Sequence, residues 1–288
     1  MRWSRPPAGT VALVLLALIA FASNSLLTRL ALGSNRIDAA TFTVLRLISG
    51  AVMLAVLVRA RKARGTASPG AGLIGAIALF AYAAPFSFAY LRIGAAVGAL
   101  VLFGAVQLTM IGYGLYRGER LSAAAWIGLA CAVVGLGILN APSASRPDPA
   151  GVAQMAVAGV AWGVYSLAGR TASDPVAANA RSFMLSSMPA VALAVALRDV
   201  AIASNAGILL ATLSGAVTSG LGYAIWYRAL PRLSVMQAAV AQLSVPVIAA
   251  VGAVAFLEEP LTIRLVVSGI AVLGGVGIVL KARSGKRA

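Results

Sequence analysis

The sequence predicts an all-α polytopic membrane protein in which ten transmembrane helices form two inverted five-helix repeats. Three observations lead to this fold class. Of the 288 residues, 61% are apolar and only 10% are charged, whereas soluble domains average about 25% charged residues. The charges separate ten apolar runs, most of them long enough to span a bilayer. Features of the first five runs recur in the last five at a nearly constant spacing.

Nine of the ten runs contain no charged residue, and the second is interrupted only by Arg46. The runs are continuously apolar and rich in Ala, Leu and Gly, whereas an outer-membrane barrel would alternate apolar and polar residues, so we expect helices. In chain order the runs cover residues 6–28, 39–58, 65–91, 93–116, 121–145, 149–169, 182–197, 200–227, 233–257 and 265–280.

The first run also has features of a cleaved signal peptide, because Arg2 and Arg5 precede it and it contains Ala20-Phe21-Ala22. The run is long for a signal peptide, and its sequence recurs later in the chain. We therefore expect it to be retained as the first transmembrane helix.

The distribution of basic residues predicts the orientation of the chain. With the N-terminus placed in the cytoplasm, sixteen Lys and Arg residues fall on the cytoplasmic side and six on the other, with Arg46 inside a helix. Basic residues accumulate on the cytoplasmic side of membrane proteins. We therefore predict a bacterial-type inner (plasma) membrane protein with both termini in the cytoplasm.

An internal repeat divides the chain into two units. The segment from Val11 to Arg29 is similar to the segment from Val152 to Arg170, at a spacing of 141 residues. We predict a first five-helix repeat over residues 1–140, a linker over 141–150 and a second repeat over 151–288. Because five is odd, the second repeat enters the membrane from the opposite side.

Inverted repeats are typical of transporters, in which two half-structures exchange conformations around a site near the middle of the membrane. The alternative is a duplication that only stabilises the bundle. Transport is the stronger interpretation, because a ten-helix bundle without catalytic residues has few other uses.

The composition argues against an enzyme and against bound cofactors or metals. The chain has no His, one cysteine (Cys131) and seven carboxylates, so it lacks the residues for common nucleophile–base pairs and metal sites. The basic residues that give the chain its net charge of +16 lie between the apolar runs. This distribution indicates a membrane protein and no nucleic-acid partner.

Two acidic turns carry a resemblance to a known family. Gly118-Glu119-Arg120-Leu121-Ser122 and Glu258-Glu259-Pro260-Leu261-Thr262 each precede a glycine-rich fifth helix. This pattern resembles the EamA repeat of the drug/metabolite transporter superfamily, and among its members the YddG-type amino acid exporters are most similar. The resemblance implies a ten-helix exporter of metabolites or drugs.

The first helix of each repeat provides the first candidate substrate-binding residues. Phe21 and Asn24 are equivalent to Trp162 and Tyr165, so each helix presents an aromatic residue and a hydrogen-bonding residue on one face. Ser25 completes this set. The alternative is that Trp162 and Tyr165 anchor the helix at the membrane interface and Asn24 bonds a neighbouring helix.

Further candidates lie on the third, fourth, eighth and ninth helices. Substrate binding is predicted for Tyr82, Gln107, Tyr223, Trp226 and Gln242, and a gating or hinge role for Pro85 and Pro246. Pro246 removes a backbone hydrogen bond in mid-helix and frees the carbonyl of Gln242. The alternative is an ordinary kink repaired by Ser244.

Charge and glycine patterns inside the helices give three further expectations. No carboxylate lies at membrane depth, so no proton-coupling acid is visible. Arg46 is expected to reach outward to solvent or pair with Asp38, although it is also suited to a substrate carboxylate.

The pairs Gly94/Gly98 and Gly159/Gly163 predict close helix packing.

Together these residues favour broad-specificity export of aromatic and other neutral amino acids, or similar metabolites, by alternating access around a central cavity. Neutral amides and aromatic walls suit a zwitterion. The alternative is a multidrug or lipid-precursor exporter of the same superfamily. The expected partners are a small-molecule substrate and the lipid bilayer, and the chain is expected to be a monomer or weak dimer.

Overall fold

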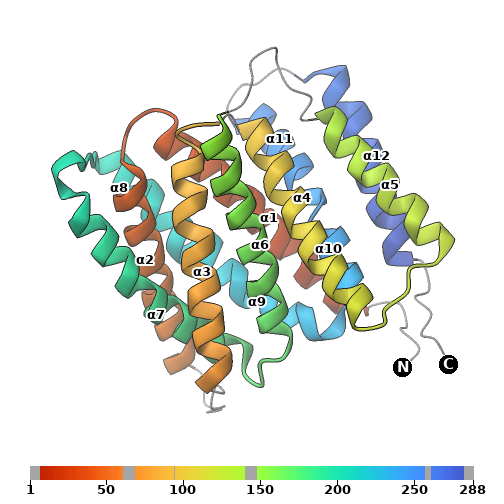
Figure 1. The fold of residues 1–288 in the computed structure, drawn as a ribbon, viewed down its shortest axis with the longest axis horizontal. Helices are drawn as coiled ribbons and strands as arrows, with labels where there is room; N and C mark the ends of the chain where they lie inside the picture. Colours follow the sequence, from red (N-terminus) through yellow and green to blue (C-terminus); the bar gives the residue numbers. More distant parts are fainter. Residues whose placement is uncertain (1–6, 61–68, 94, 140–147, 257–260, 282–288) are drawn as a thin grey trace.

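The computed structural model describes residues 7–60, 69–93, 95–139, 148–256 and 261–281, which form a bundle of helices (Figure 1). Most of the predicted linker and the acidic residues Glu258 and Glu259 lie outside the described residues. The helices in chain order are α1 (Ala8–Leu32), α2 (Ala39–Ala60), α3 (Pro69–Ala89), α4 (Ala95–Tyr116), α5 (Ala123–Leu139), α6 (Pro149–Arg170), α7 (Pro175–Ala196), the 3-10 helix η1 (Arg198–Val200), α8 (Asn205–Leu213), the π-helix η2 (Ser214–Leu221), α9 (Gly222–Ala229), the 3-10 helix η3 (Leu230–Arg232), α10 (Val235–Ala241), α11 (Ser244–Phe256) and α12 (Ile263–Lys281).

Each of the ten apolar runs coincides with helical backbone. Within the described residues, eight helical segments are long and apolar enough to cross a membrane. The helices of the remaining two runs, α5 and α7, are not among these eight. Helix α5 has only 17 residues, and α7 is less apolar because it contains Asn179, Arg181 and several serines. The prediction of an all-helical, multi-pass membrane protein is therefore confirmed, and ten inverted crossings remain a prediction.

The eighth and ninth runs are not uniform α-helices. The eighth run contains α8, η2 and α9, and the ninth is divided into α10 and α11 at Gln242 and Leu243. Pro246 has no N–H to bond the Gln242 carbonyl, which instead accepts from the Val245 N–H at 3.1 Å. The helix is therefore interrupted four residues before Pro246, but the Gln242 carbonyl is not left free as expected. The role of Pro246 as a hinge stays a prediction.

Carboxylates cap the starts of α6 and α7. Asp174 accepts from the Val176 and Ala177 N–H groups at 3.0 and 3.1 Å, so α7 begins at Pro175 and continues through Arg181. The helix therefore begins before the apolar run of residues 182–197, and Arg181 lies within it and not at its start. Asp148 caps α6 in the same way.

Helices of the two halves of the chain pack against each other. At one end of the bundle α5 packs on α12, and at the other α2 packs on α7 (Figure 1). Between them, α3 packs on α6 and α7, while the segment from α8 to α9 packs on α1 and α2. This interleaving places one face of α1 and one face of α6 against helices of the other half.

Glycines let α6 approach α4 closely. A Cβ atom on Gly159 would lie 2.5 Å from the Leu102 carbonyl oxygen, and one on Gly163 would lie 2.8 Å from the Thr109 Cβ. The close packing predicted for this pair is confirmed. A Cβ on Gly98 would lie 3.0 Å from the Met155 side chain, and Gly94 lies outside the described residues.

Candidate functional site

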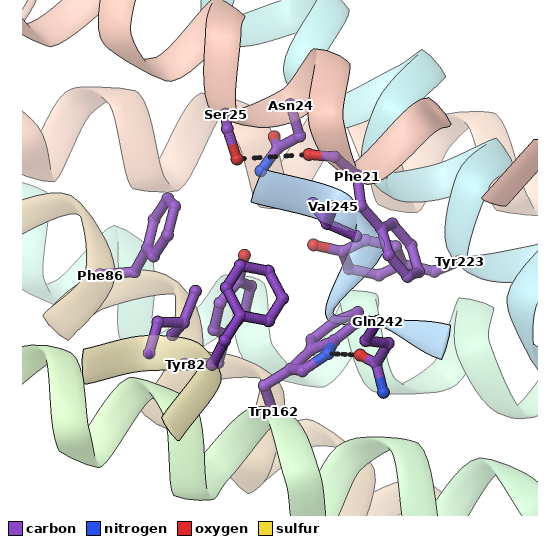
Figure 2. A pocket seen from close by; sticks show the side chains of 11 residues that line it. Phe21, Asn24, Ser25, Tyr82, Phe86, Trp162, Tyr223, Gln242 and Val245 are labelled. Carbon is purple, nitrogen blue, oxygen red and sulfur yellow. Dashed lines mark hydrogen bonds between the residues drawn. The ribbon is translucent and has the colours of Figure 1, made fainter. Parts of the chain in front are cut away.

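A small cavity of about 30 Å³ lies among helices from both halves of the chain (Figure 2). Its walls combine aromatic rings with amide and hydroxyl groups. The lining residues are Phe21, Asn24, Ser25, Tyr82, Phe86, Leu102, Phe103, Trp162, Tyr223, Gln242 and Val245. Seven of the ten predicted binding residues are in this set, and they come from five separate segments of the chain.

Phe21 of α1 and Trp162 of α6 meet in the cavity wall. Their ring centroids are 5.2 Å apart and the ring planes are at 88°, an edge-to-face contact that aromatic pairs favour. Tyr82 and Tyr223 pack on Trp162 with centroid distances of 5.0 and 4.8 Å. The residues at equivalent positions of the predicted repeats therefore touch each other.

Gln242 holds the Trp162 ring from the break between α10 and α11. The Trp162 Nε1–H donates to the Gln242 Oε1 (Figure 2). The Gln242 Nε2 donates to the Ala238 carbonyl at 3.2 Å and to the Met110 sulfur at 3.3 Å. The amide and the indole thus fix each other's orientation at the cavity.

Asn24 connects the cavity to the π-helix η2. Its Oδ1 accepts from the Ser214 hydroxyl at 2.7 Å and from the Thr218 hydroxyl at 3.3 Å. Its amide nitrogen points toward the cavity (Figure 2). Ser25 beside it donates to the Phe21 carbonyl at 3.4 Å. The polar end of the cavity is therefore built from α1, with support from η2.

Three predicted binding residues lie behind the cavity wall. The Tyr165 hydroxyl donates to the Asn179 Oδ1, and the Trp226 Nε1 donates to the Ser166 hydroxyl at 3.4 Å. The Gln107 Nε2 donates to the Ala239 carbonyl at 2.7 Å. These contacts hold helices together behind the lining. Pro85 lies within α3 and does not interrupt it.

Arg46 of α2 is buried, with 1% of its surface exposed. Its Nε donates to the Ser219 hydroxyl at 2.9 Å, and its Nη2 donates to the hydroxyls of Tyr223 at 2.6 Å and Tyr82 at 3.3 Å. The expectation that Arg46 reaches outward to solvent is therefore wrong, because neutral hydroxyls from α3, η2 and α9 hold its head group inside the bundle.

The expected pairing of Arg46 with Asp38 is also wrong. The Asp38 carboxylate caps α2 by accepting from the Ala40 and Thr41 N–H groups, both at 2.9 Å. Its second oxygen accepts from the Ile202 N–H at 3.0 Å. Asp38 is occupied by these backbone contacts at the helix end, and Arg46 lies deeper.

The described carboxylates all lie at helix ends or in connecting segments. They are Asp38, Glu119, Asp148, Asp174 and Asp199. In the part of the chain that the structure describes, no three Cys, Asp or Glu side chains gather as metal ligands would.

Arg46 lies beside the cavity but was not among the predicted binding residues. The signal was present, because it is the only charge inside an apolar run. Its partners Ser219 and Tyr223 lie 173 and 177 residues away along the chain. No local pattern reveals that these hydroxyls surround the guanidinium.

Comparison with known proteins places this architecture among transporters. Residues 149–281 match the EamA-like transporter family. An uncharacterized protein of Pseudomonas aeruginosa is 48% identical over 98% of both chains. An uncharacterized transporter of Archaeoglobus fulgidus is 24% identical over 82% of this chain and 86% of its own. A solved crystal structure has a TM-score of 0.76 over 92% of this chain and 97% of that one at 20% identity, which shows the fold alone.

Proposed function

This chain belongs to the EamA-like transporter family, and from that premise we propose that it exports aromatic and other neutral amino acids or similar small metabolites. The substrate passes through the cavity between α1 and α6 by alternating access. The proposal includes ten membrane crossings, with residues 1–140 and 151–288 as inverted repeats, in a bacterial inner membrane with both termini in the cytoplasm.

The observation that carries this proposal is the contact between Phe21 and Trp162. These residues occupy equivalent positions in the two predicted repeats, and they face one cavity whose other walls also come from both halves. In transporters built from inverted repeats, the substrate site lies at the interface of the repeats.

The helix packing supports the inverted-repeat arrangement. The packing of α3 on α6 and α7 corresponds to the packing of α8, η2 and α9 on α1 and α2. The pairs α5–α12 and α2–α7 each join helices at the same position of the two halves. Such correspondence is expected if the halves are related by a two-fold axis in the membrane plane.

The size of the cavity supports a cycle in which the bundle opens. Small-molecule sites have volumes of about 300–1,000 Å³, and this cavity has about 30 Å³. The described conformation is therefore closed around its site. The π-helix η2 and the break at Gln242 are places where backbone hydrogen bonding is already irregular, so both are suited to act as hinges.

The chemistry of the lining suits a zwitterion. The faces of Trp162, Phe21 and Tyr82 attract an ammonium group through cation–π interactions, and they cover an apolar side chain. The Asn24 amide nitrogen is a donor for a carboxylate. These groups bind the parts that all neutral amino acids share, so broad specificity follows.

The test is uptake of labelled phenylalanine, methionine and threonine into proteoliposomes, with and without an imposed pH gradient. Because the described carboxylates lie at helix ends, we expect saturable flux that the gradient does not change. Flux equal to that of empty liposomes for all three amino acids would refute the substrate class. Flux that depends on the gradient would refute transport without proton coupling.

A second candidate function, export of a drug or lipid precursor, is favoured by one feature. An apolar groove of about 600 Å³ lies on the outside of α3 and α6, where isoleucine and valine side chains face outward. Its residues are Ile74, Ile77, Ala78, Ala81, Ala156, Val157, Val160, Ala161 and Val164. If hydrophobic dyes cross the same proteoliposomes and amino acids do not, this alternative replaces the first.

A further inference from the structure

We infer that Arg46 is the binding group for the anionic end of the substrate, so that the site takes compounds with a free carboxylate. This inference rests on the proposed function and adds to it the chemical group that a substrate must carry. It depends on the hydrogen bonding of Arg46, on its position beside the cavity and on the charges around it.

The guanidinium of Arg46 is incompletely paired. Its Nε and Nη2 donate to three neutral hydroxyls, whereas its Nη1 is buried and has no hydrogen-bond partner among the described residues. The faces of Tyr82 and Phe86 lie 5.2 and 5.7 Å from its Cζ. These contacts lower the cost of burying the charge but do not neutralise it.

No counter-ion for Arg46 comes from the described part of the protein. The groups that act on its charge are the hydroxyls of Tyr82 and Tyr223, and Asp38 is engaged by backbone N–H groups. A buried cation without an anion is costly inside a membrane, and such residues mark substrate pathways. A ligand that brings a negative charge supplies what the protein lacks.

The guanidinium is next to the cavity. Tyr82 and Tyr223 touch Arg46 through their hydroxyls and line the cavity with their rings. Phe86 also contacts the guanidinium and lines the cavity. An anion that accepts from the unpaired Nη1 would therefore lie beside the cavity wall formed by Tyr82, Phe86 and Tyr223.

The surroundings of Arg46 select for an anion. The tyrosine hydroxyls accept from the guanidinium and leave its positive charge without a neutralising anion. The Asn24 amide nitrogen points toward the same cavity (Figure 2). Arg forms strong charge-assisted hydrogen bonds with carboxylates and cannot lose its proton. An amine without a carboxylate meets only repulsion from this charge.

The site therefore distinguishes a carboxylate from the matching carboxamide. Binding of phenylalanine, phenylalaninamide, 3-phenylpropionate and 3-phenylpropionamide to the purified full-length protein is measured by the shift in thermal unfolding temperature. We expect phenylalanine and 3-phenylpropionate to bind at least about tenfold more tightly than their amides, which corresponds to one lost charge-assisted contact.

The variants Arg46→Gln and Arg46→Lys test whether Arg46 causes the preference for the carboxylate. Arg46→Gln is expected to remove the preference for the carboxylate, and Arg46→Lys is expected to keep part of it because the charge remains. The control is Arg264→Gln, which changes an exposed arginine near the start of α12 and is expected to keep the full preference.

The outcomes separate this inference from the proposed function. Equal binding of acid and amide by the wild-type protein, or an unchanged preference in Arg46→Gln, overturns the inference even if amino acid flux is observed. Carboxylate binding that needs Arg46, without amino acid flux in proteoliposomes, overturns the proposed substrates and supports the inference. If Arg46→Gln does not fold, binding of the acid and of the amide is compared between the wild type and Arg46→Lys. A smaller preference for the acid in Arg46→Lys then supports the inference, and an unchanged preference overturns it.

Discussion

At the scale of single residues, Asp38 links stability to pH. Burial raises the pKa of its carboxyl, but the hydrogen bonds from Thr41, Ile202 and Ala40 together outweigh burial and hold the pKa below its ordinary value. A lowered folded-state pKa stabilises the fold above the unfolded-state value of about 3.9. This contribution is lost as the pH falls through the folded-state pKa.

We predict that the melting temperature of the wild type falls between pH 5 and pH 2 more steeply than that of Asp38→Asn. Thermal unfolding in detergent across this range measures the difference. The matched control is Asp199→Asn, because the side chain of Asp199 is 92% exposed. The prediction is contradicted if the melting curves of the wild type and Asp38→Asn change with pH in parallel.

Single residues also show what the sequence can predict. The repeat spacing identified Phe21 and Trp162 as equivalent, and this was sufficient to predict two aromatic residues that line one cavity. Arg46 was different, because two of its three hydroxyl partners, Ser219 and Tyr223, come from the other half of the chain. Only the three-dimensional arrangement shows that hydroxyls replace a counter-ion.

At the scale of elements, Glu119 ties the end of α4 to the start of α10. Its two carboxylate oxygens accept from the Val235 and Met236 N–H groups at 3.1 and 3.2 Å. Gly118 precedes it with a φ of +80°, a conformation that favours glycine. The acidic turn noted in the sequence thus acts as a helix cap supplied by the other half of the chain.

We predict that Glu119→Ala lowers the free energy of unfolding by about 1 kcal/mol, the usual effect of removing a helix cap. Glu119→Gln is expected to lower the free energy of unfolding by less, because the glutamine amide oxygen still accepts a hydrogen bond. Thermal unfolding of both variants beside Arg117→Ala, at an exposed neighbouring position, measures the effect. A loss equal to that of Arg117→Ala would contradict the capping role.

The contact between α4 and α6 gives a second prediction for elements. Gly159→Val places side-chain atoms where a Cβ alone is 2.5 Å from the Leu102 carbonyl oxygen, so we expect a loss of about 1–3 kcal/mol from overpacking. Gly104→Val on α4 is the control, because a Cβ there has no neighbour within 4 Å. Equal melting temperatures of the two variants would show that this contact adapts without cost.

Apolar runs predicted the positions of the elements better than their internal structure. The π-helix η2 lies in an unbroken apolar run, and its irregular hydrogen bonding fits the polar contacts of Ser214 and Thr218 with Asn24. Such contacts depend on a distant helix. The break before Pro246 was predictable because proline removes a specific hydrogen bond.

At the scale of the whole molecule, the proposed inverted repeats predict opposite exposure of equivalent loops. Ser34 follows α1 and Ser173 follows α6, the first helix of each half. In a Cys131→Ser background, we predict that a membrane-impermeant maleimide applied to the outside labels Ser34→Cys and not Ser173→Cys. Labelling of both positions from the same side would contradict inverted repeats.

The sequence could predict the class of the molecule because apolar length and charge placement follow directly from the membrane. It could not predict the interleaving of the halves, in which α3 packs on α6 and α7. That packing is set by surface shapes such as the glycines of α6. The size of the cavity is set by the same side-chain packing, which composition does not reveal.

In the proposed mechanism, substrate passes between α1 and α6 at Trp162. The most direct test is the initial rate of phenylalanine flux in proteoliposomes for the wild type, Trp162→Ala and Trp126→Ala. Trp126 lies on α5 and is 48% exposed, so it controls for the loss of a tryptophan. We predict at least about a tenfold fall for Trp162→Ala, as for loss of a buried aromatic contact, and no change for Trp126→Ala. Equal rates for the wild type and Trp162→Ala would contradict the claim.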